Sequence, residues 1–239
     1  MTERIQTIRH DDGVVELHLV REDKMNALDP AMFDALIAHG EQLREDRRVR
    51  AVVITGRGRA FCAGLDMESF SKMGEGGNMD LLPRTHGIAN KPQYIATVWR
   101  DVPVPVIAAV HGVASGGGLQ LALGADLRLI TADTRLSVME IKWGLVPDMG
   151  GLPLLRPLVR DDVARELAYT GRIVTGEEAV ALGLATRVVT DPLAEAQRLA
   201  HEIAARSPDA IRANKRLFNA VADVRVSDAQ LLMAESEEQ

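Results

Sequence analysis

The sequence has one cysteine, few aromatic residues and no long uninterrupted apolar run. Cys62 has no second cysteine in its own chain, which excludes an internal disulfide and favours a reducing compartment. No apolar segment approaches the roughly 18 residues of a membrane-spanning helix, and the first residues do not resemble a signal peptide. We therefore expect a cytoplasmic protein without a membrane partner.

An excess of basic residues is also missing. The 28 Lys and Arg residues are outnumbered by 34 Asp and Glu residues, which gives a formal net charge of -6. Aromatic residues make up 3% of the chain, so few side chains can stack on nucleic-acid bases. Both deficits argue against a nucleic-acid partner. The length of 239 residues, 46% of them hydrophobic, is sufficient for one substantial core.

The most informative segment of the chain is 104–126. Val104–Val110 is an uncharged run rich in Val and Ile, which is typical of a strand buried on both faces. Gly116–Gly118 follow, and the Ala- and Leu-rich residues up to Leu123 indicate a short buried helix. Such a junction directs unpaired backbone N–H groups at a ligand. The P-loop and dinucleotide motifs are absent here, and close packing of helix on strand is the alternative reason for the glycines.

A second glycine turn, Gly56–Asp66, lies upstream. It follows a predicted buried strand at Ala51–Thr55 and precedes a predicted short helix at Asp66–Lys72. Because both turns follow parallel strands, their free N–H groups lie at one edge of the sheet and can converge on one oxygen atom. Cys62 lies in this turn with Arg59 as its one basic neighbour, which favours a buried, unreactive thiol over a nucleophile.

The remaining elements alternate between strands and helices, which predicts an α/β fold with parallel strands. An opening hairpin is indicated around residues 11–13, with a half-buried second strand, and Asp29 is a predicted helix N-cap. Further strands are expected at 127–130 and 185–189, and further helices at 86–100, 161–169, 175–182, 192–206 and 208–221. The helices of the C-terminal third have no predicted sheet of their own, so we expect them to pack against a partner subunit.

A third loop, 137–151, contains two carboxylates, Glu140 and Asp148. They are eight residues apart in an apolar stretch with Trp and Gly, where an ionised side chain needs a functional or structural reason. One reason is catalysis. The other is a simple ion pair of either carboxylate with Lys142.

Together these separated motifs resemble the enoyl-CoA hydratase/isomerase family, also called the crotonase superfamily. The matching segments are AFCAGLD at 60–66, VIAAVHGVASGGGLQLALGADLRL at 106–129, SVMEIKWGLVPDMGG at 137–151, and the helical segments 170–189 and 207–219. The resemblance implies a crotonase-like spiral of repeated ββα units in residues 1–190, a helical trimerisation region in 191–239, and a homotrimer or dimer of trimers. It also implies acyl-CoA substrates of fatty acid metabolism, with no metal and no separate cofactor, since coenzyme A is part of the substrate.

The resemblance also implies roles for individual residues. A proton leaves the α-carbon of the thioester, and two backbone N–H groups stabilise the resulting oxyanion. By resemblance these donors are the amides of Ala63 and Gly117. The residues expected to contact the substrate or its CoA moiety are Lys24, Ala63, Gly64, Leu65, Asp66, Gly116 and Gly117.

Gln120 is the main departure from the family pattern. Family hydratases carry two glutamates, and this chain has Glu140 at the second position but Gln120 at the first. We expect Gln120, one helical step after Gly117, to face the substrate. Because Gln cannot exchange protons near neutral pH, this departure favours double-bond isomerisation, with Glu140 as base and Asp148 assisting. Enoyl-CoA hydratase (lyase) activity and a catalytically weak acyl-CoA-binding protein remain as alternatives.

Overall fold

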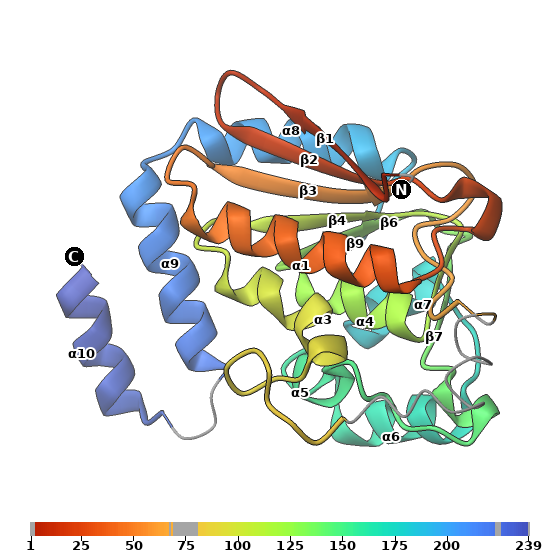
Figure 1. Ribbon diagram of the computed structural model, residues 1–239. Helices are drawn as coiled ribbons and strands as arrows, with labels where there is room; N and C mark the ends of the chain where they lie inside the picture. The colour runs from red at the N-terminus through yellow and green to blue at the C-terminus, as the bar shows by residue number, and fades with distance from the viewer. Residues whose placement is uncertain (1–2, 67, 69–80, 223–225, 239) are drawn as a thin grey trace.

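The computed structural model describes residues 3–66, 68, 81–222 and 226–238, and within them the strands form two sheets (Figure 1). The first strand pair of the larger sheet is antiparallel and the others are parallel, which confirms the predicted hairpin and the parallel α/β arrangement. The larger sheet has the order β1 (Ile5–Arg9), β2 (Val14–Leu19), β3 (Ala51–Gly56), β4 (Val106–Val110), β6 (Leu127–Ile130) and β9 (Arg187–Val188). The smaller sheet has the order β5 (Val113–Ser115), β7 (Arg135–Ser137) and β8 (Val174–Thr175).

Helices lie on both sides of the larger sheet (Figure 1). The α-helices of the described residues are α1 (Pro30–Glu45), α3 (Lys91–Asp101), α4 (Gly117–Gly124), α5 (Gly151–Leu155), α6 (Asp161–Thr170), α7 (Gly176–Leu182), α8 (Pro192–Ala204), α9 (Pro208–Val221) and α10 (Asp228–Glu238). The described residues also form two short 3-10 helices, η1 (Glu22–Lys24) and η2 (Glu140–Trp143). None of the helices described has the length and apolar character needed to cross a membrane.

The chain alternates between the two sheets as it advances. After β4 it enters β5 of the smaller sheet and then α4, and after β6 it enters β7. The segment after β3 behaves in the same way, because Cys62 forms a bridge with Ala114 of β5. This repetition is the expected crotonase-like spiral of ββα units. It brings the ends of β3, β4 and β6 to a common edge of the fold, as expected for parallel strands.

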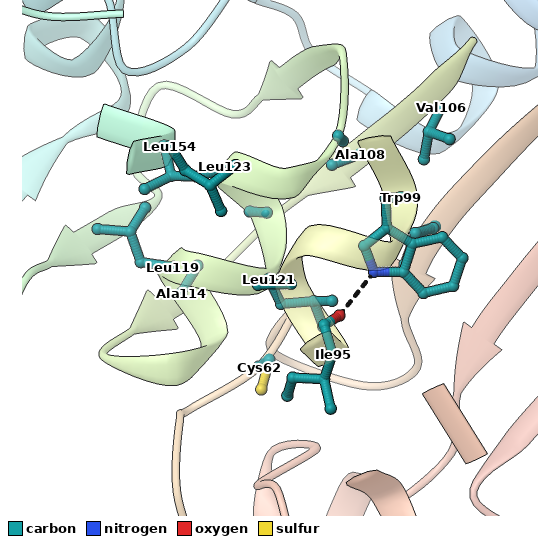
Figure 2. Packing of buried hydrophobic residues seen from close by; sticks show 14 of the residues in the cluster. Cys62, Ile95, Trp99, Val106, Ala108, Ala114, Leu119, Leu121, Leu123 and Leu154 are labelled. Atoms are coloured by element: carbon teal, nitrogen blue, oxygen red, sulfur yellow. Dashed lines mark hydrogen bonds between the residues drawn. The ribbon is translucent and has the colours of Figure 1, made fainter. Parts of the chain in front are cut away.

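Helix α4 is buried along its whole length, and the core around it fixes its position. Figure 2 shows Leu119, Leu121 and Leu123 of this helix among the side chains of α3 and α5. In α3, Trp99 is fully buried, and its Nε1–H donates to the backbone oxygen of Ile95 at 2.8 Å. The N-terminus of α4 therefore projects from a densely packed core, which suits an N-terminus that must hold backbone donors in place.

Some predicted element boundaries are wrong. The predicted helix 86–100 begins only at Lys91, because Asn90 caps it: the Asn90 side chain accepts from the N–H of Gln93, and the Gln93 side chain accepts from the N–H of Asn90. Strand β2 is buried on both faces instead of one. The sequence pattern predicts neither the three short strands of the smaller sheet nor helix α5. Most of the predicted helix Asp66–Lys72 lies outside the described residues.

The C-terminal helices differ in their environments. Helix α8 packs on the larger sheet through Ala196, Ala200 and Ala204, so the expectation that these helices have no sheet is wrong for α8. Helix α9 is held by Lys215, whose buried ammonium donates to the Trp99 oxygen at 2.9 Å and to the Val104 oxygen at 2.8 Å. Helix α10 packs on α9 at the periphery (Figure 1). The division of the chain at residue 190 stays a prediction.

Candidate active site

A cavity of about 460 Å³ opens at the edge where the glycine turns meet. Nine of the ten predicted site residues line it, although they come from four separate segments of the chain. These nine are Lys24, Ala63, Gly64, Leu65, Asp66, Gly116, Gly117, Glu140 and Asp148. The tenth, Gln120, is buried behind the cavity wall.

The two glycine turns touch at Gly64. Its backbone φ of 94° lies in the left-handed region, and a Cβ atom there would lie 2.5 Å from the carbonyl oxygen of Ser115 and 3.6 Å from the amide nitrogen of Gly117. Any side chain at this position would therefore push the upstream turn away from the start of α4. Glycine at position 64 is what allows backbone donors from both turns to face the same cavity.

The hydrogen bonds of these turns correct one predicted donor. The N–H of Ala63 already donates to the carbonyl oxygen of Met25 at 2.9 Å, so Ala63 does not supply a free amide. In contrast, the N–H groups of Leu65 and Gly117 make no hydrogen bond with any described residue, and both residues line the cavity. Gly64, in its left-handed conformation, separates the amides of Ala63 and Leu65. The sequence contains no signal that identifies which of these two amides is free.

Gln120 holds together the loop at residues 137–151 that carries Glu140 and Asp148. Its Nε2–H donates to Glu140 Oε1 at 2.6 Å, and its Oε1 accepts from the N–H of Met149 at 2.9 Å and from the N–H of Gly151 at 2.8 Å. The expectation that Gln120 faces the substrate is therefore wrong. Because its oxygen and one N–H are committed to these partners, Gln120 fixes the positions of Glu140 and of the turn that contains Asp148.

Glu140 keeps one oxygen atom available. While Oε1 is bound to Gln120, Oε2 is buried and has no hydrogen-bond partner among the described residues. A buried carboxylate oxygen without a hydrogen-bond partner is energetically costly. Glu140 Oε2 is therefore a candidate to contact a ligand or to accept a proton from one.

Burial shifts the pKa values of both carboxyl groups in the loop at residues 137–151. It raises the pKa of Glu140, and the nearby charge of Asp148 adds to the rise, whereas hydrogen bonds from the backbone and from Gln120 oppose it. Burial also raises the pKa of Asp148. Neither carboxylate makes an ion pair with Lys142 among the described contacts, so the purely structural explanation of this pair is not supported. Two perturbed acids in one cavity are typical of proton-transfer sites.

Asp66 and Lys24 also line the cavity. Asp66 forms an ion pair with Arg21, whose Nη1 lies 2.5 Å from Asp66 Oδ2 and 3.0 Å from the carbonyl oxygen of Ala27. Asp66 thus fastens the loop that carries Lys24. The Cys62 thiol is buried, donates to the Asn26 oxygen at 3.1 Å and has a pKa raised by burial to about 12, which makes it unreactive.

No cluster of three or more His, Cys, Asp or Glu side chains in the described ranges is arranged to hold a metal ion. The cavity can still do chemistry without one. Among the described residues it combines two backbone N–H groups without a partner, a carboxylate whose Oε2 accepts no hydrogen bond, and a second carboxylate whose pKa is raised by burial.

Comparison with known proteins agrees with this arrangement. The profile of the family described as enoyl-CoA hydratase/isomerase matches residues 9–237. Carnitinyl-CoA dehydratase of Proteus mirabilis is 33% identical over 224 residues, which cover 92% of this chain and 82% of that protein. Mitochondrial Delta(3,5)-Delta(2,4)-dienoyl-CoA isomerase of Mus musculus is 32% identical over 221 residues, which cover 89% of this chain and 68% of that protein. The crystal structure of enoyl-CoA hydratase from Mycobacterium smegmatis superposes with a TM-score of 0.84 at 31% identity, covering 99% of this chain and 90% of that one.

The raised pKa of Glu140 leads to a stability prediction. A carboxyl group whose pKa is higher in the folded than in the unfolded state destabilises the fold once pH exceeds its unfolded value of about 4.3. Glu140→Gln removes this cost and keeps an acceptor for Gln120. We expect the variant to melt higher than the parent at pH 7, by ~2–4 °C for each kcal/mol recovered. The difference should shrink as the pH falls towards about 4 and should be absent below it, where the carboxyl group is protonated in both states.

Thermal unfolding, followed by circular dichroism from pH 7 down to about pH 4, measures the difference in melting temperature between variant and parent. Glu235→Gln, which removes an exposed carboxylate on α10, is the control and should show no comparable gain at pH 7. A Glu140→Gln variant that melts lower than the parent at pH 7 would contradict the assigned burial cost.

Proposed function

Because the chain belongs to the enoyl-CoA hydratase/isomerase family, we propose that it is a double-bond isomerase of acyl-CoA thioesters with Glu140 as base and Asp148 assisting. The observation that carries this proposal is the engagement of Gln120. At the position where family hydratases have a second glutamate, this chain has an amide that is bound to Glu140 and to two backbone N–H groups. The two perturbed acids that line the cavity, Glu140 and Asp148, are then the candidates for proton transfer.

The proposed reaction begins with the thioester oxygen between the N–H groups of Leu65 and Gly117. Glu140 Oε2 removes a proton from the α-carbon of a 3-enoyl thioester, and the electron pair moves onto the thioester oxygen as a dienolate. The two N–H groups stabilise this oxyanion, and losing one such donor typically costs about 100- to 1000-fold in rate. A proton from Asp148 or from the protonated Glu140 then reaches the γ-carbon, which yields the conjugated 2-enoyl thioester.

The pKa shifts suit this division of labour. A raised pKa makes ionised Glu140 a stronger base than an exposed glutamate. A raised pKa also lets Asp148 keep its proton to a higher pH than an exposed aspartate does. Activity should therefore rise with pH as Glu140 ionises.

Water addition is the second candidate reaction. It is favoured by the name of the Mycobacterium smegmatis enzyme, an enoyl-CoA hydratase. Hydration needs a group that activates water in addition to a donor for the α-carbon. The engaged Gln120 amide is poorly suited to that task, so we place hydration after isomerisation.

The roles of the two carboxylates can be separated by substitution. Glu140→Gln should lower both α-proton exchange into heavy water and isomerisation of a 3-enoyl thioester, by roughly the 100- to 10,000-fold typical of general acid–base groups. Asp148→Asn should reduce isomerisation more than α-proton exchange, because it acts after the proton has left the α-carbon. Absorbance of the conjugated product and mass spectrometry of exchanged deuterium measure the two steps.

The parent enzyme decides between the two reactions. A 3-enoyl and a 2-enoyl thioester are assayed side by side. The enzyme should convert the 3-enoyl thioester to the conjugated 2-enoyl product faster than it hydrates the 2-enoyl thioester. Hydration that equals or exceeds isomerisation would replace the proposed activity with that of a hydratase.

The corrected oxyanion donor requires its own test, because side-chain substitution leaves an N–H in place. Replacing residue 65 by the corresponding α-hydroxy acid turns its amide into an ester and should lower turnover by about 100- to 1000-fold. The same replacement at residue 63 deletes only the hydrogen bond to the Met25 oxygen and should be much milder. Equal losses at both positions, or a larger loss at 63, would restore Ala63 as the donor.

We also propose a homotrimer, or two stacked trimers, assembled through the C-terminal helices. Its support is the apolar surface of α9 and α10, where Phe218, Val221, Leu232 and Met233 are 74%, 59%, 63% and 62% exposed. Exposed apolar surface of this kind is typical of subunit interfaces.

Light scattering at micromolar concentration should give three or six times the chain mass of 26.0 kDa. Phe218→Glu should shift the protein towards the monomer, whereas Ala38→Glu, on the exposed side of α1, should leave the mass unchanged. A clean monomer for the parent protein would refute the assembly.

A further inference from the structure

The turn at residues 147–150 forms part of two cavities. Asp148 and Met149 line the active-site cavity, while Pro147, Asp148 and Gly150 line a second cavity of about 620 Å³. The second cavity lies between this turn and α3, where Tyr94 and Thr97 contribute to its wall. Asp148 is common to both, so the turn is the partition between them.

Met149 occupies the position next to the proposed oxyanion donor. A Cβ atom on Gly117 would lie 2.7 Å from Met149 Sδ and 3.1 Å from its Cε, so the thioether packs directly on the Gly117 backbone. The side chain is 6% exposed, and the backbone N–H of Met149 is fixed by Gln120. An acyl group whose thioester oxygen binds at Gly117 therefore meets Met149 within its first carbon atoms.

The second cavity has the apolar surface that a longer acyl tail would need. Ile88, Val146 and Leu152 line it and are 96%, 68% and 59% exposed. Among the described residues, Met149, which packs on Gly117, and Asp148, which lines both cavities, stand between Gly117 and this surface. A hydrocarbon tail that passed Asp148 would remove water from its carboxyl group without replacing the lost hydrogen bonds, so Asp148 adds a polar barrier to the steric one.

We propose that Met149, with Asp148 beside it, ends the acyl site, so that this enzyme selects short-chain acyl-CoA thioesters. This inference rests on the proposed acyl-CoA function and adds the substrate class to it. Met149 is the specificity-determining side chain. The second cavity stays outside the acyl site as long as Met149 keeps its length.

Binding of saturated acyl-CoA thioesters tests this without any reaction. Each methylene that becomes buried raises affinity by about fourfold. In calorimetric titrations of the parent protein from butanoyl- to dodecanoyl-CoA, affinity should rise with chain length and then level off or fall where the tail meets Met149. We call the chain length at which affinity stops rising the break. In Met149→Ala the break should move to longer acyl chains, and in Met149→Val it should move by less.

Met139→Ala is the matched control, because Met139 is a second methionine of the same cavity that lies towards Gly116 and outside the partition. It should leave the break where the parent has it. The inference is overturned if affinity keeps rising through dodecanoyl-CoA in the parent. It is equally overturned if neither Met149 variant moves the break, or if Met139→Ala moves it as far.

The same titrations separate this inference from the function on which it rests. If neither free CoA nor butanoyl-CoA binds, the acyl-CoA function itself is refuted, together with the length limit. If short thioesters bind and the break does not respond to residue 149, only the length limit is refuted. Since Met149→Val removes fewer atoms than Met149→Ala, it provides the result should the alanine variant fail to fold.

Discussion

The active site depends on one buried amide, that of Gln120. It is a polar side chain on a helix that is otherwise apolar, and its hydrogen bonds reach two segments that lie 20 and about 30 residues further along the chain. A buried polar group that finds partners rigidifies its surroundings, whereas an unsatisfied one costs free energy. The donor and acceptor groups of this single side chain connect the N-terminal part of α4, the Glu140 turn and the partition at 147–150. If the amide lost these partners, the proposed base Glu140 and the proposed wall of the acyl site would lose their common support.

The position of Gln120 is itself a result of core packing. All residues of α4 are buried, and the helix is enclosed by α3, α5 and the smaller sheet. A helix held on all sides presents its first N–H groups with little freedom to move, which is the arrangement that electrostatic stabilisation of an oxyanion requires. The contact between Gly64 and the Ser115 oxygen then brings the second donor to the same cavity.

The site is costly for the fold in a specific way. Glu140 has a buried oxygen without a partner among the described residues, and two carboxylates with raised pKa share one cavity. A more stable chain could replace either carboxylate by a neutral side chain. Groups kept at the expense of stability are typical of catalytic sites, where activity and stability oppose each other. This cost supports a chemical role for Glu140 and Asp148 more strongly than their spacing in the sequence does.

Local patterns in the sequence determined the main elements, the two glycine turns, the pair of carboxylates and the resemblance to the family. Those features depend on residues close in the chain: the apolar run of β4, the Asp29 cap of α1 and the Gly116–Gly118 turn. Only the tertiary structure decided which amide is free, where Gln120 points and what covers the second face of β2. The Ala63 amide is occupied by the Met25 oxygen, 38 residues away, and β2 is covered by α8 from near the other end of the chain. These outcomes depend on partners distant in sequence and on the left-handed Gly64, and neither leaves a periodic or compositional signal in the residues themselves.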